Sequence, residues 1–275
     1  VSGGHDPQAS LLAPKSSVGF GGGSASTAIE LPLTAEETEA ALATAQRMGE
    51  APIRVPRAAE LGYQSSGSIG GEPFEIQTTL RWRQDGQRYD SLWTLYSPRV
   101  GEQTRRSTGL LTPQGLVPVL AELRTTTTQE MRFDHVAQRV RFGATGTDAP
   151  LRAGMQDRLS ALIQLSALLA GDPSRYPVGS TIELPAVHPR GAGTWRFVVE
   201  TDEAVVALRG QTVPTLRLVH AAQDEHDARI ELWLGRTMDY LPVRLRVTEA
   251  NGDSALHTVT SAYTLTVPNG PAPQR

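Results

Sequence analysis

The residues best suited to chemistry in this sequence are the tetrad Asp-Glu-His-Asp at 224–227. Carboxylates together with an imidazole, here that of His226, are ordinary ligands of zinc and other divalent cations. The tetrad falls between two segments with strand character, however, where acidic turns are common. We therefore interpret it as a solvated turn and predict no metal site.

Motifs of nucleophilic, acid–base and phosphate chemistry are weak as well. Asp134 and His135 are adjacent, but no Gly-x-Ser-x-Gly motif accompanies them. The glycine-rich run GFGGGS at 19–24 lacks the preceding strand and the following helix of a phosphate-binding loop. The carboxylates form no pattern that indicates glycoside hydrolysis. We predict no catalytic residue and no cofactor, and hence a protein that is not an enzyme.

Composition excludes further classes of function. The chain has 275 residues, a formal net charge of -3 and no cysteine, which rules out disulfides and thiol catalysis. Basic residues form no run and do not alternate with aromatic ones, so we predict no nucleic-acid partner. No apolar run is long enough to span a membrane. The first residue is Val1 rather than methionine, which is consistent either with a processed product that has lost a targeting segment or with a trimmed piece of a longer chain. A removed anchoring segment would bring the protein near a membrane.

The elements that would position any site fall into four segments. Residues 1–30 are rich in Gly, Ser and Pro and are predicted to form a disordered tail or linker. Residues 31–56 are predicted to form a helical extension, with Thr34 as its N-cap. Residues 57–267 have the pattern of an antiparallel β domain with one central helix, and residues 268–275 are predicted to be a disordered C-terminal tail.

The β domain is indicated by alternating apolar and polar residues with hairpin turns between the segments. Asp85-Gly86 and Asn251-Gly252 are strong signals for hairpin turns. Turns recur at roughly even spacing, and strands do not alternate with helices. We predict a mainly β protein whose curled antiparallel sheet forms a barrel or a half-barrel.

One long helical pattern, MQDRLSALIQLSALLAGD, interrupts the strands, and we place the helix at residues 155–170. Its apolar residues cover well over half of the circumference, so the helix has to be buried on most sides. Gln156, Ser160 and Gln164 follow an i, i+4 spacing and form a narrow polar stripe. The helix is predicted to lie in the concave face of the sheet. It either completes a solid core or lines an apolar cavity that the polar stripe faces.

Aromatic and basic side chains on the predicted strands allow the same two interpretations. Tryptophans and tyrosines are mostly core residues in such sheets, but they can also line a ligand site. Arginines near the helix can form structural ion pairs or contact an anionic headgroup. The candidate ligand-binding residues are therefore Gln156, Ser160, Gln164, Trp82, Trp93, Trp233, Arg158 and Arg244.

Several longer motifs resemble a known family. They are QDRLS at 156–160, FD at 133–134, ELWL at 231–234, YLPVR at 240–244, and the turns STGLL and GLVPV. These motifs, in the order in which they follow one another along the chain, resemble those of the bacterial domain-of-unknown-function family 3108 over residues 57 to 265. The resemblance implies an exported or membrane-anchored envelope protein of Gram-negative bacteria, without an established activity. It also implies, by analogy of shape, a fold related to lipoprotein-carrier half-barrels.

These observations lead to one main hypothesis and two alternatives. We predict a non-enzymatic protein of the cell envelope, exposed to the periplasm, that binds a hydrophobic or amphipathic ligand in a cavity between sheet and helix. The ligand would be a lipid or a lipid-bearing partner. The first alternative is a protein–protein scaffold in envelope assembly, with a filled core. The second is a hydrolase of envelope polymers.

Overall fold

The computed structural model describes residues 29–97, 101–143, 146–188, 191–223 and 227–265. Four sequence predictions therefore lie wholly or largely outside the described residues: the tail 1–30, the tail 268–275, the GFGGGS run, and residues 224–226 of the acidic tetrad. In the described part of the chain, no helix combines the length and the apolar character needed to cross a membrane.

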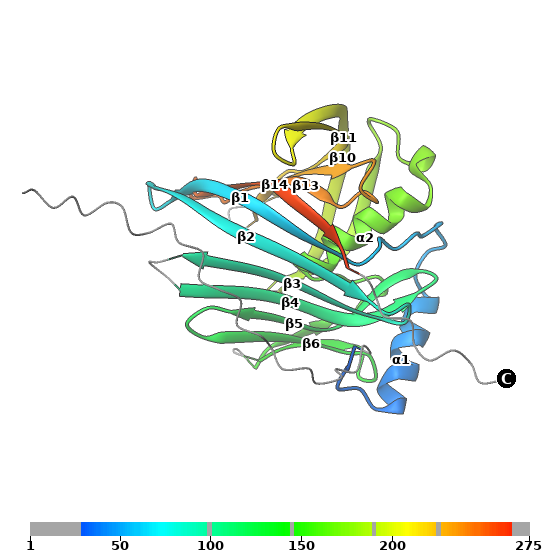
Figure 1. Cartoon of the computed structure of the whole chain (residues 1–275). Coiled ribbons are helices and arrows are strands. Elements are labelled where there is room, and N and C mark those ends of the chain that lie inside the picture. The colour runs from blue at the N-terminus through cyan, green and yellow to red at the C-terminus, as the bar shows by residue number, and fades with distance from the viewer. Residues whose placement is uncertain (1–28, 98–100, 144–145, 189–190, 224–226, 266–275) are drawn as a thin grey trace, which may run out of the picture.

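Among the described residues, fourteen β-strands form a single curled sheet (Figure 1). All neighbouring strands are antiparallel, and their order is β8-β7-β6-β5-β4-β3-β2-β1-β14-β13-β12-β11-β10-β9. The strands are β1 (Ala59–Ile69), β2 (Glu72–Gln84), β3 (Arg88–Ser97), β4 (Gly101–Thr112), β5 (Gly115–Arg124), β6 (Thr128–Asp134), β7 (Arg139–Phe142), β8 (Asp148–Pro150), β9 (Thr181–His188), β10 (Gly191–Ala207), β11 (Gln211–His220), β12 (Arg229–Gly235), β13 (Pro242–Thr248) and β14 (Ser254–Thr264). Within β1–β8 and within β9–β14, each strand pairs with the next along the chain. The sheet thus consists of two meanders, which are joined where β1 pairs with β14.

The free edges of the sheet are β8 and β9, which do not pair with each other in the described residues. A single bridge between Gln156 and Ala186 connects the segment after β8 to the edge strand β9. The predicted mainly β, antiparallel architecture is confirmed. Of the two predicted shapes, the described strands form the open one rather than a closed barrel.

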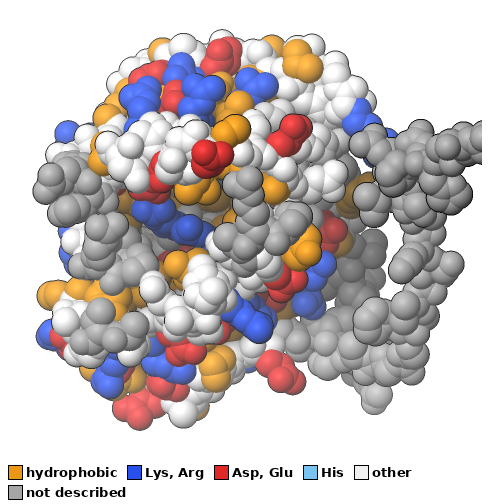
Figure 2. All heavy atoms as spheres, turned by 90° about the vertical axis from the view of Figure 1, so that its left-hand side faces the viewer, with side chains coloured by type: hydrophobic (Ala, Val, Ile, Leu, Met, Phe, Trp, Pro, Cys, Tyr) orange, Lys and Arg blue, Asp and Glu red, His pale blue; other side chains and the backbone are white. Residues whose placement is uncertain are grey.

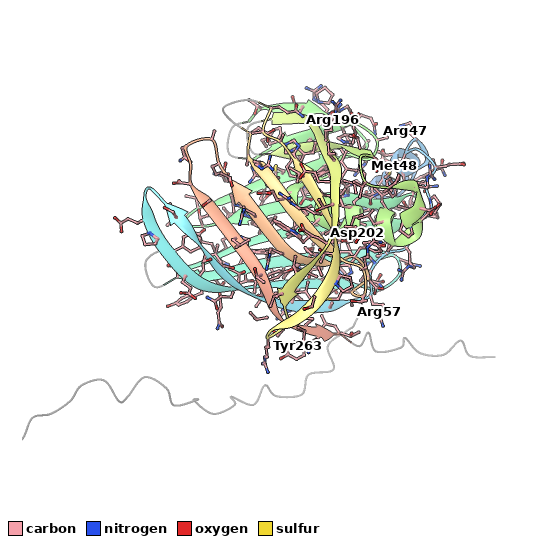
Figure 3. All side chains as sticks on the ribbon, turned by 90° about the horizontal axis from the view of Figure 1, so that it is seen from above. Arg47, Met48, Arg57, Arg196, Asp202 and Tyr263 are labelled. Atoms are coloured by element: carbon pink, nitrogen blue, oxygen red, sulfur yellow. The ribbon has the colours of Figure 1, made fainter. Side chains whose placement is uncertain are left out.

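Side chains from both meanders meet on the concave face of the sheet. Leu80 and Trp82 of β2 belong to the same buried cluster as Leu218 of β11 and Leu232 of β12. Because these strands lie far apart in the sheet order, one shared cluster requires the sheet to curl, as Figures 1 and 3 show. The curl encloses a continuous apolar core.

Both predicted hairpins are confirmed: Asp85-Gly86 lies between β2 and β3, and Asn251-Gly252 lies between β13 and β14. Gly86 and Gly252 both have a φ of +88°, a region that glycine enters at no steric cost because it lacks a Cβ. Asp85 Oδ1 accepts a hydrogen bond from the backbone N–H of Arg88 at 2.8 Å. Local turn chemistry therefore fixes the register of these two hairpins.

The N-terminal helix α1 (Ala35–Gln46) begins with the predicted cap. Thr34 Oγ1 accepts a hydrogen bond from the Glu37 N–H at 3.1 Å, and Glu37 Oε2 accepts one from the Thr34 N–H at 2.8 Å. The buried alanines of α1 pack with Leu110 of β4 and Val117 of β5. A small Ala-rich face thus attaches this helix to the sheet.

The second helix, α2 (Arg158–Gly171), connects β8 to β9 and so crosses from one edge of the sheet to the other. Every residue from Leu159 to Ala170 is buried. The helix begins later than the predicted range 155–170 because Asp157 takes the N-cap position. Both helices lie at the same end of the sheet (Figure 1).

Candidate ligand-binding site

The concave face of the sheet is fully buried at the end that holds α2 and partly exposed at the opposite end. On β2, Trp82 is 1% exposed, whereas Ile76, on the same face but farther from α2, is only half-buried. On β3, Tyr89 is 0% exposed and Leu95 is half-buried. The same face therefore changes from solid core to accessible surface along each strand.

The half-buried residues surround a depression at the end of the sheet opposite α2. Figure 2 views this end of the molecule and shows a hollow with basic side chains at its base. Four strands contribute apolar side chains to its walls, namely Ile76 of β2, Leu95 of β3, Leu123 of β5 and Val247 of β13. We call the space between these four residues, together with the basic residues below them, the hollow.

Arg105 of β4 faces the hollow. It stands opposite Trp93 on β3 and opposite Leu123 on β5, so it shares the concave face with both. The side chain is exposed, yet the pKa of Arg105 is lowered to about 10. Burial is the main cause, the nearby charge of Arg158 acts in the same direction, and Glu249 opposes both. The guanidinium group of Arg105 is thus accessible to water but not fully surrounded by it, as expected for a side chain in an open hollow.

Arg158, the first residue of α2, is the second basic residue here, because the start of α2 reaches toward the hollow: the adjacent Asp157 is bonded to Ser107, two residues from Arg105 on β4. Its Nε atom is buried and has no hydrogen-bond partner. Within the described part of the chain, neither Arg158 nor Arg105 forms an ion pair with a carboxylate. The positive charge at the base of the hollow is therefore not neutralised by direct contact.

A group of rings lies beside Arg105. The Trp93 ring meets His257 edge-on with centroids 5.0 Å apart, and the Tyr63 ring lies 5.0 Å from Trp93 at a tilt. Ser65 Oγ is 2.7 Å from Nδ1 of His257. Burial, with a further contribution from Arg105, lowers the pKa of His257 to about 4. This imidazole is neutral at neutral pH, so the charge of the hollow comes from the arginines.

Asp157 fastens the start of α2 to the sheet. Its Oδ1 accepts hydrogen bonds from the backbone N–H groups of Leu159 at 2.8 Å and Ser160 at 3.1 Å, which have no partner within the helix. Its Oδ2 accepts a hydrogen bond from Ser107 Oγ of β4 at 2.6 Å, and the Tyr89 hydroxyl lies 3.1 Å from the same Ser107 Oγ. Burial raises the pKa of Asp157.

Replacing Asp157 tests this attachment. We expect Asp157→Ala to lower the free energy of unfolding by about 1–2 kcal/mol, the cost of a lost N-cap. Asp157→Asn keeps the capping oxygen, and Ser107 and Tyr89 can reverse their shared hydrogen bond so that Ser107 accepts from the new amide. We therefore expect Asp157→Asn to stay within about 0.5 kcal/mol of the wild type at neutral pH. Urea denaturation followed by circular dichroism measures both, and equal losses would contradict the capping role.

The raised pKa of Asp157 also gives a pH dependence. A carboxyl group with a higher pKa in the folded state than in the unfolded state favours folding when it is protonated. Its contribution to stability therefore falls as the pH rises from the unfolded value of about 3.9 to the higher folded value. Because Asp157→Asn removes the titration, the stability of the wild type relative to this variant is expected to decrease over that interval.

The predicted polar stripe of α2 is hydrogen-bonded to the protein. Gln164 Oε1 accepts a hydrogen bond from the Leu116 N–H at 2.8 Å, and Gln156 Nε2 donates one to Leu116 O at 2.9 Å. Ser160 completes the capping box with Asp157. Gln156 and Gln164 thus attach this segment to the sheet, Ser160 stabilises the start of the helix, and contact of these three side chains with a ligand stays a prediction.

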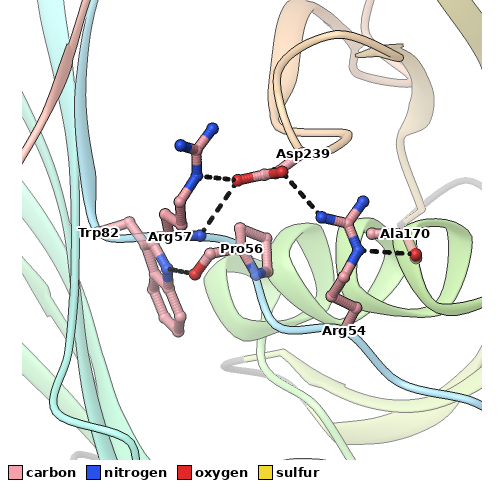
Figure 4. A network of polar contacts seen from close by, with 6 residues as sticks. All are labelled: Arg54, Pro56, Arg57, Trp82, Ala170 and Asp239. Carbon is pink, nitrogen blue, oxygen red and sulfur yellow. Dashed lines mark hydrogen bonds and ion pairs between the residues drawn. The ribbon is translucent and has the colours of Figure 1, made fainter.

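Trp82 lies at the end of the sheet that holds α2, away from the hollow. Its Nε1 donates a hydrogen bond to Pro56 O at 3.0 Å. The same segment carries Arg57 and Arg54, whose guanidinium groups bind the Asp239 carboxylate at 2.9 and 3.1 Å (Figure 4). The segment that precedes β1 thus covers this end, and Trp82 is part of its core.

Trp233 and Arg244 lie on the opposite, convex face. Leu232 and Leu234 are fully buried in the core, so Trp233 between them points away from the concave face. Its ring lies 5.1 Å from the guanidinium carbon of Arg217 and 5.7 Å from that of Arg244. The structure does not bring these two predicted residues to the hollow.

Of the predicted ligand-binding residues, the structure brings Trp93 and Arg158 to the hollow. Arg105 and His257 also lie there and were not predicted. The sequence holds one indirect signal for Arg105, which is its place in a strand pattern. Arg105 and Arg106 are adjacent and chemically identical, however, so the sequence does not show which of them faces inward.

The last residue of the acidic tetrad is described and has a structural partner. Asp227 Oδ2 lies 2.8 Å from His220 Nε2. Among the residues that the structure describes, no three His, Cys, Asp or Glu side chains gather in a way that could hold a metal ion.

A family model described as "Protein of unknown function (DUF3108)" matches residues 68–259. No curated protein matches this chain in sequence. The family match therefore identifies a group of related sequences without assigning an activity.

Solved structures with some likeness to this chain include MucB, with a TM-score of 0.32 and 12% identity over 87% of this chain and 62% of that one. A putative outer membrane lipoprotein-sorting protein domain from Vibrio parahaemolyticus has a TM-score of 0.28 and 11% identity, covering 84% of this chain and 93% of that one. A DUF1329 family protein from Desulfovibrio piger has a TM-score of 0.27 and 10% identity, covering 83% and 92%. With TM-scores this low, the function has to be argued from the residues of this chain.

Proposed function

Because this chain belongs to the DUF3108 family, a family of unknown function, we propose from the geometry of the hollow that it binds a hydrophobic or amphipathic ligand there. The ligand is a lipid or a lipid-bearing partner, held without chemical change. We place the protein in the cell envelope, exposed to the periplasm, in line with the family resemblance of its motifs.

The proposal rests on one observation, the exposure gradient along the concave face. Ile76, Leu95, Leu123 and Val247 lie on a surface that continues into the solid core, but they remain partly accessible to water. Covering apolar surface contributes roughly 25 cal/mol per Å². A concave apolar surface with a few polar groups at its base is the usual form of a small-molecule site. An acyl chain would complete the core that the sheet leaves open.

A different observation supports the scaffold alternative. Around α2 the core is filled, since every residue from Leu159 to Ala170 is buried. If the hollow were also closed by side chains in solution, the protein would have no room for a guest and would act through its outer surface. Ligand binding distinguishes the two functions directly.

Leu95→Asp tests the proposed function. A carboxylate in the apolar wall would lose its hydration when a chain binds, and we expect the affinity for myristoyl lysophosphatidylcholine to fall about tenfold, which corresponds to about 1.4 kcal/mol. Isothermal titration calorimetry below the critical micelle concentration measures this change. Thermal unfolding of the variant shows whether the fold is retained.

The adjacent residue supplies a matched control. Tyr96 is 63% exposed and lies on the opposite face of β3, so Tyr96→Asp is expected to leave the affinity unchanged. The wild type failing to bind any amphiphile would refute the proposed function and favour the scaffold. Equal losses in Leu95→Asp and Tyr96→Asp would show that binding does not occur in the hollow.

A further inference from the structure

The arginines of this sheet differ in how they are neutralised. Arg106 points to the convex face and binds Asp90 through two hydrogen bonds of 2.8 and 3.1 Å. Arg105, the next residue on the same strand, points into the hollow and has no such partner in the described chain. An arginine without a carboxylate partner thus stands on the concave face of the sheet.

The second arginine increases the excess of positive charge. Arg158 lies close enough to Arg105 to lower the pKa of that guanidinium, and Glu249 is the carboxylate that counteracts it. Two like charges in a partly desolvated place repel each other more strongly than in bulk water. The free protein bears this repulsion, which a bound anion would relieve.

Hydrogen-bond donors without a partner also favour an anionic ligand. A guanidinium carries five N–H donors in a planar fork, and the Nε of Arg158 is buried without an acceptor. A buried donor without a partner costs about 1–3 kcal/mol. Carboxylate and phosphate oxygens match the fork geometry and accept two bonds from one guanidinium. An oxyanion would therefore satisfy these donors better than a neutral hydroxyl group would.

We propose that the hollow selects an amphiphile with an anionic head, a carboxylate or a phosphate, whose oxygens bind Arg105 and Arg158 while its apolar chain lies against Ile76, Leu95 and Val247. This inference rests on the proposed function and adds the charge class of the ligand. Neighbouring His257 is neutral at neutral pH, since its pKa is lowered to about 4, and adds no charge to the contact.

The test compares two lipids with the same acyl chain. Calorimetric titration of the full chain with myristoyl lysophosphatidylglycerol, which is anionic, and with monomyristoyl glycerol, which is uncharged and has no phosphate, gives the preference as a ratio of dissociation constants. We expect the wild type to bind the anionic lipid about tenfold more tightly. Arg105→Gln and Arg158→Gln are each expected to remove most of that ratio while leaving the affinity for the uncharged lipid within about twofold. Arg105→Lys keeps the positive charge but loses the planar array of guanidinium donors, so an intermediate ratio of the two dissociation constants is expected.

Arg124→Gln is the matched control. Arg124 adjoins Leu123 on β5, but it is exposed and lies on the convex face, so its removal is expected to leave the ratio unchanged. Thermal unfolding of each variant confirms that the fold persists.

The outcomes separate this inference from the proposed function. Equal affinity of the wild type for the two lipids, or an unchanged ratio in Arg105→Gln, would overturn the anionic selection and leave amphiphile binding in place. Binding of neither lipid would overturn both. Glycerol phosphate, which has the head and no acyl chain, is expected to bind at least a hundredfold more weakly. If it binds as tightly as the anionic lipid, the site takes small anions and the apolar chain plays no part.

Discussion

Leu165→Ala is expected to lower the free energy of unfolding by about 2–5 kcal/mol, the largest effect of the substitutions considered. Leu165 is 0% exposed in the middle of α2 and belongs to the cluster that both meanders share. Truncating it removes apolar contacts and leaves a cavity that a close-packed core fills only in part. Alanine is the best helix former, so the loss reports packing between helix and sheet rather than a weaker helix.

Urea denaturation monitored by circular dichroism measures the effect of Leu165→Ala. Leu42 of α1 provides the control because it is 45% exposed, and Leu42→Ala is expected to change stability by no more than about 0.5 kcal/mol. A loss below about 1 kcal/mol for Leu165→Ala would mean that the core collapses around the shortened side chain. The helix would then not be the element that holds the two meanders together.

Gly171→Ala is expected to cost about 1–3 kcal/mol or more, by overpacking rather than by a cavity. A Cβ on Gly171 would lie 2.1 Å from Pro52 O and 2.8 Å from Ile53 N. Both are backbone atoms, so no side-chain rotation relieves the clash. Either the end of α2 or the segment that carries Pro52 has to move. The hydrogen bonds from Arg54 N to Ala167 O at 3.1 Å and from Arg54 Nε to Ala170 O at 3.0 Å would weaken with it.

Thermal unfolding and amide hydrogen exchange together test this expectation. Gly171→Ala should lower the melting temperature and speed exchange at the Arg54 amide, which α2 protects. Gly49→Ala is the control, because no atom lies within 4 Å of the added Cβ. Unchanged exchange at Arg54 in Gly171→Ala would show that the segment before β1 tolerates the methyl group.

Features governed by neighbouring residues could be predicted from the sequence. The turns at Asp85-Gly86 and Asn251-Gly252 and the cap at Thr34 depend on contacts a few residues apart, and all occur as expected. The apolar helix could also be recognised, because a helix without a polar face has to be buried. Its first residue was harder to place, since the sequence does not show that Asp157 also accepts a hydrogen bond from Ser107 of a distant strand.

Features governed by register and by distant segments could not be predicted. Pairing with Trp93 decides that Arg105 faces inward, and a slip of one residue would exchange it with Arg106. The burial of Trp233 cannot be predicted from the sequence of β12 either, because a distant segment covers this side chain. Trp233 Nε1 donates a hydrogen bond at 2.6 Å to Glu203 Oε1 of β10, which belongs to the long β10–β11 hairpin. No local pattern encodes such a contact between distant strands.

The order of the strands also determines when the sheet can be completed during synthesis. Ala59 pairs with Thr264, so the middle of the sheet joins the two ends of the β domain, whereas its outer parts grow from one hairpin to the next. Contacts between distant segments close slowly because the intervening chain must first be ordered. Until β14 leaves the ribosome or the export channel, β1 keeps one edge unpaired, and an unpaired edge is open to the wrong partner. An edge that stays unpaired in the nascent protein therefore becomes the centre of the finished sheet.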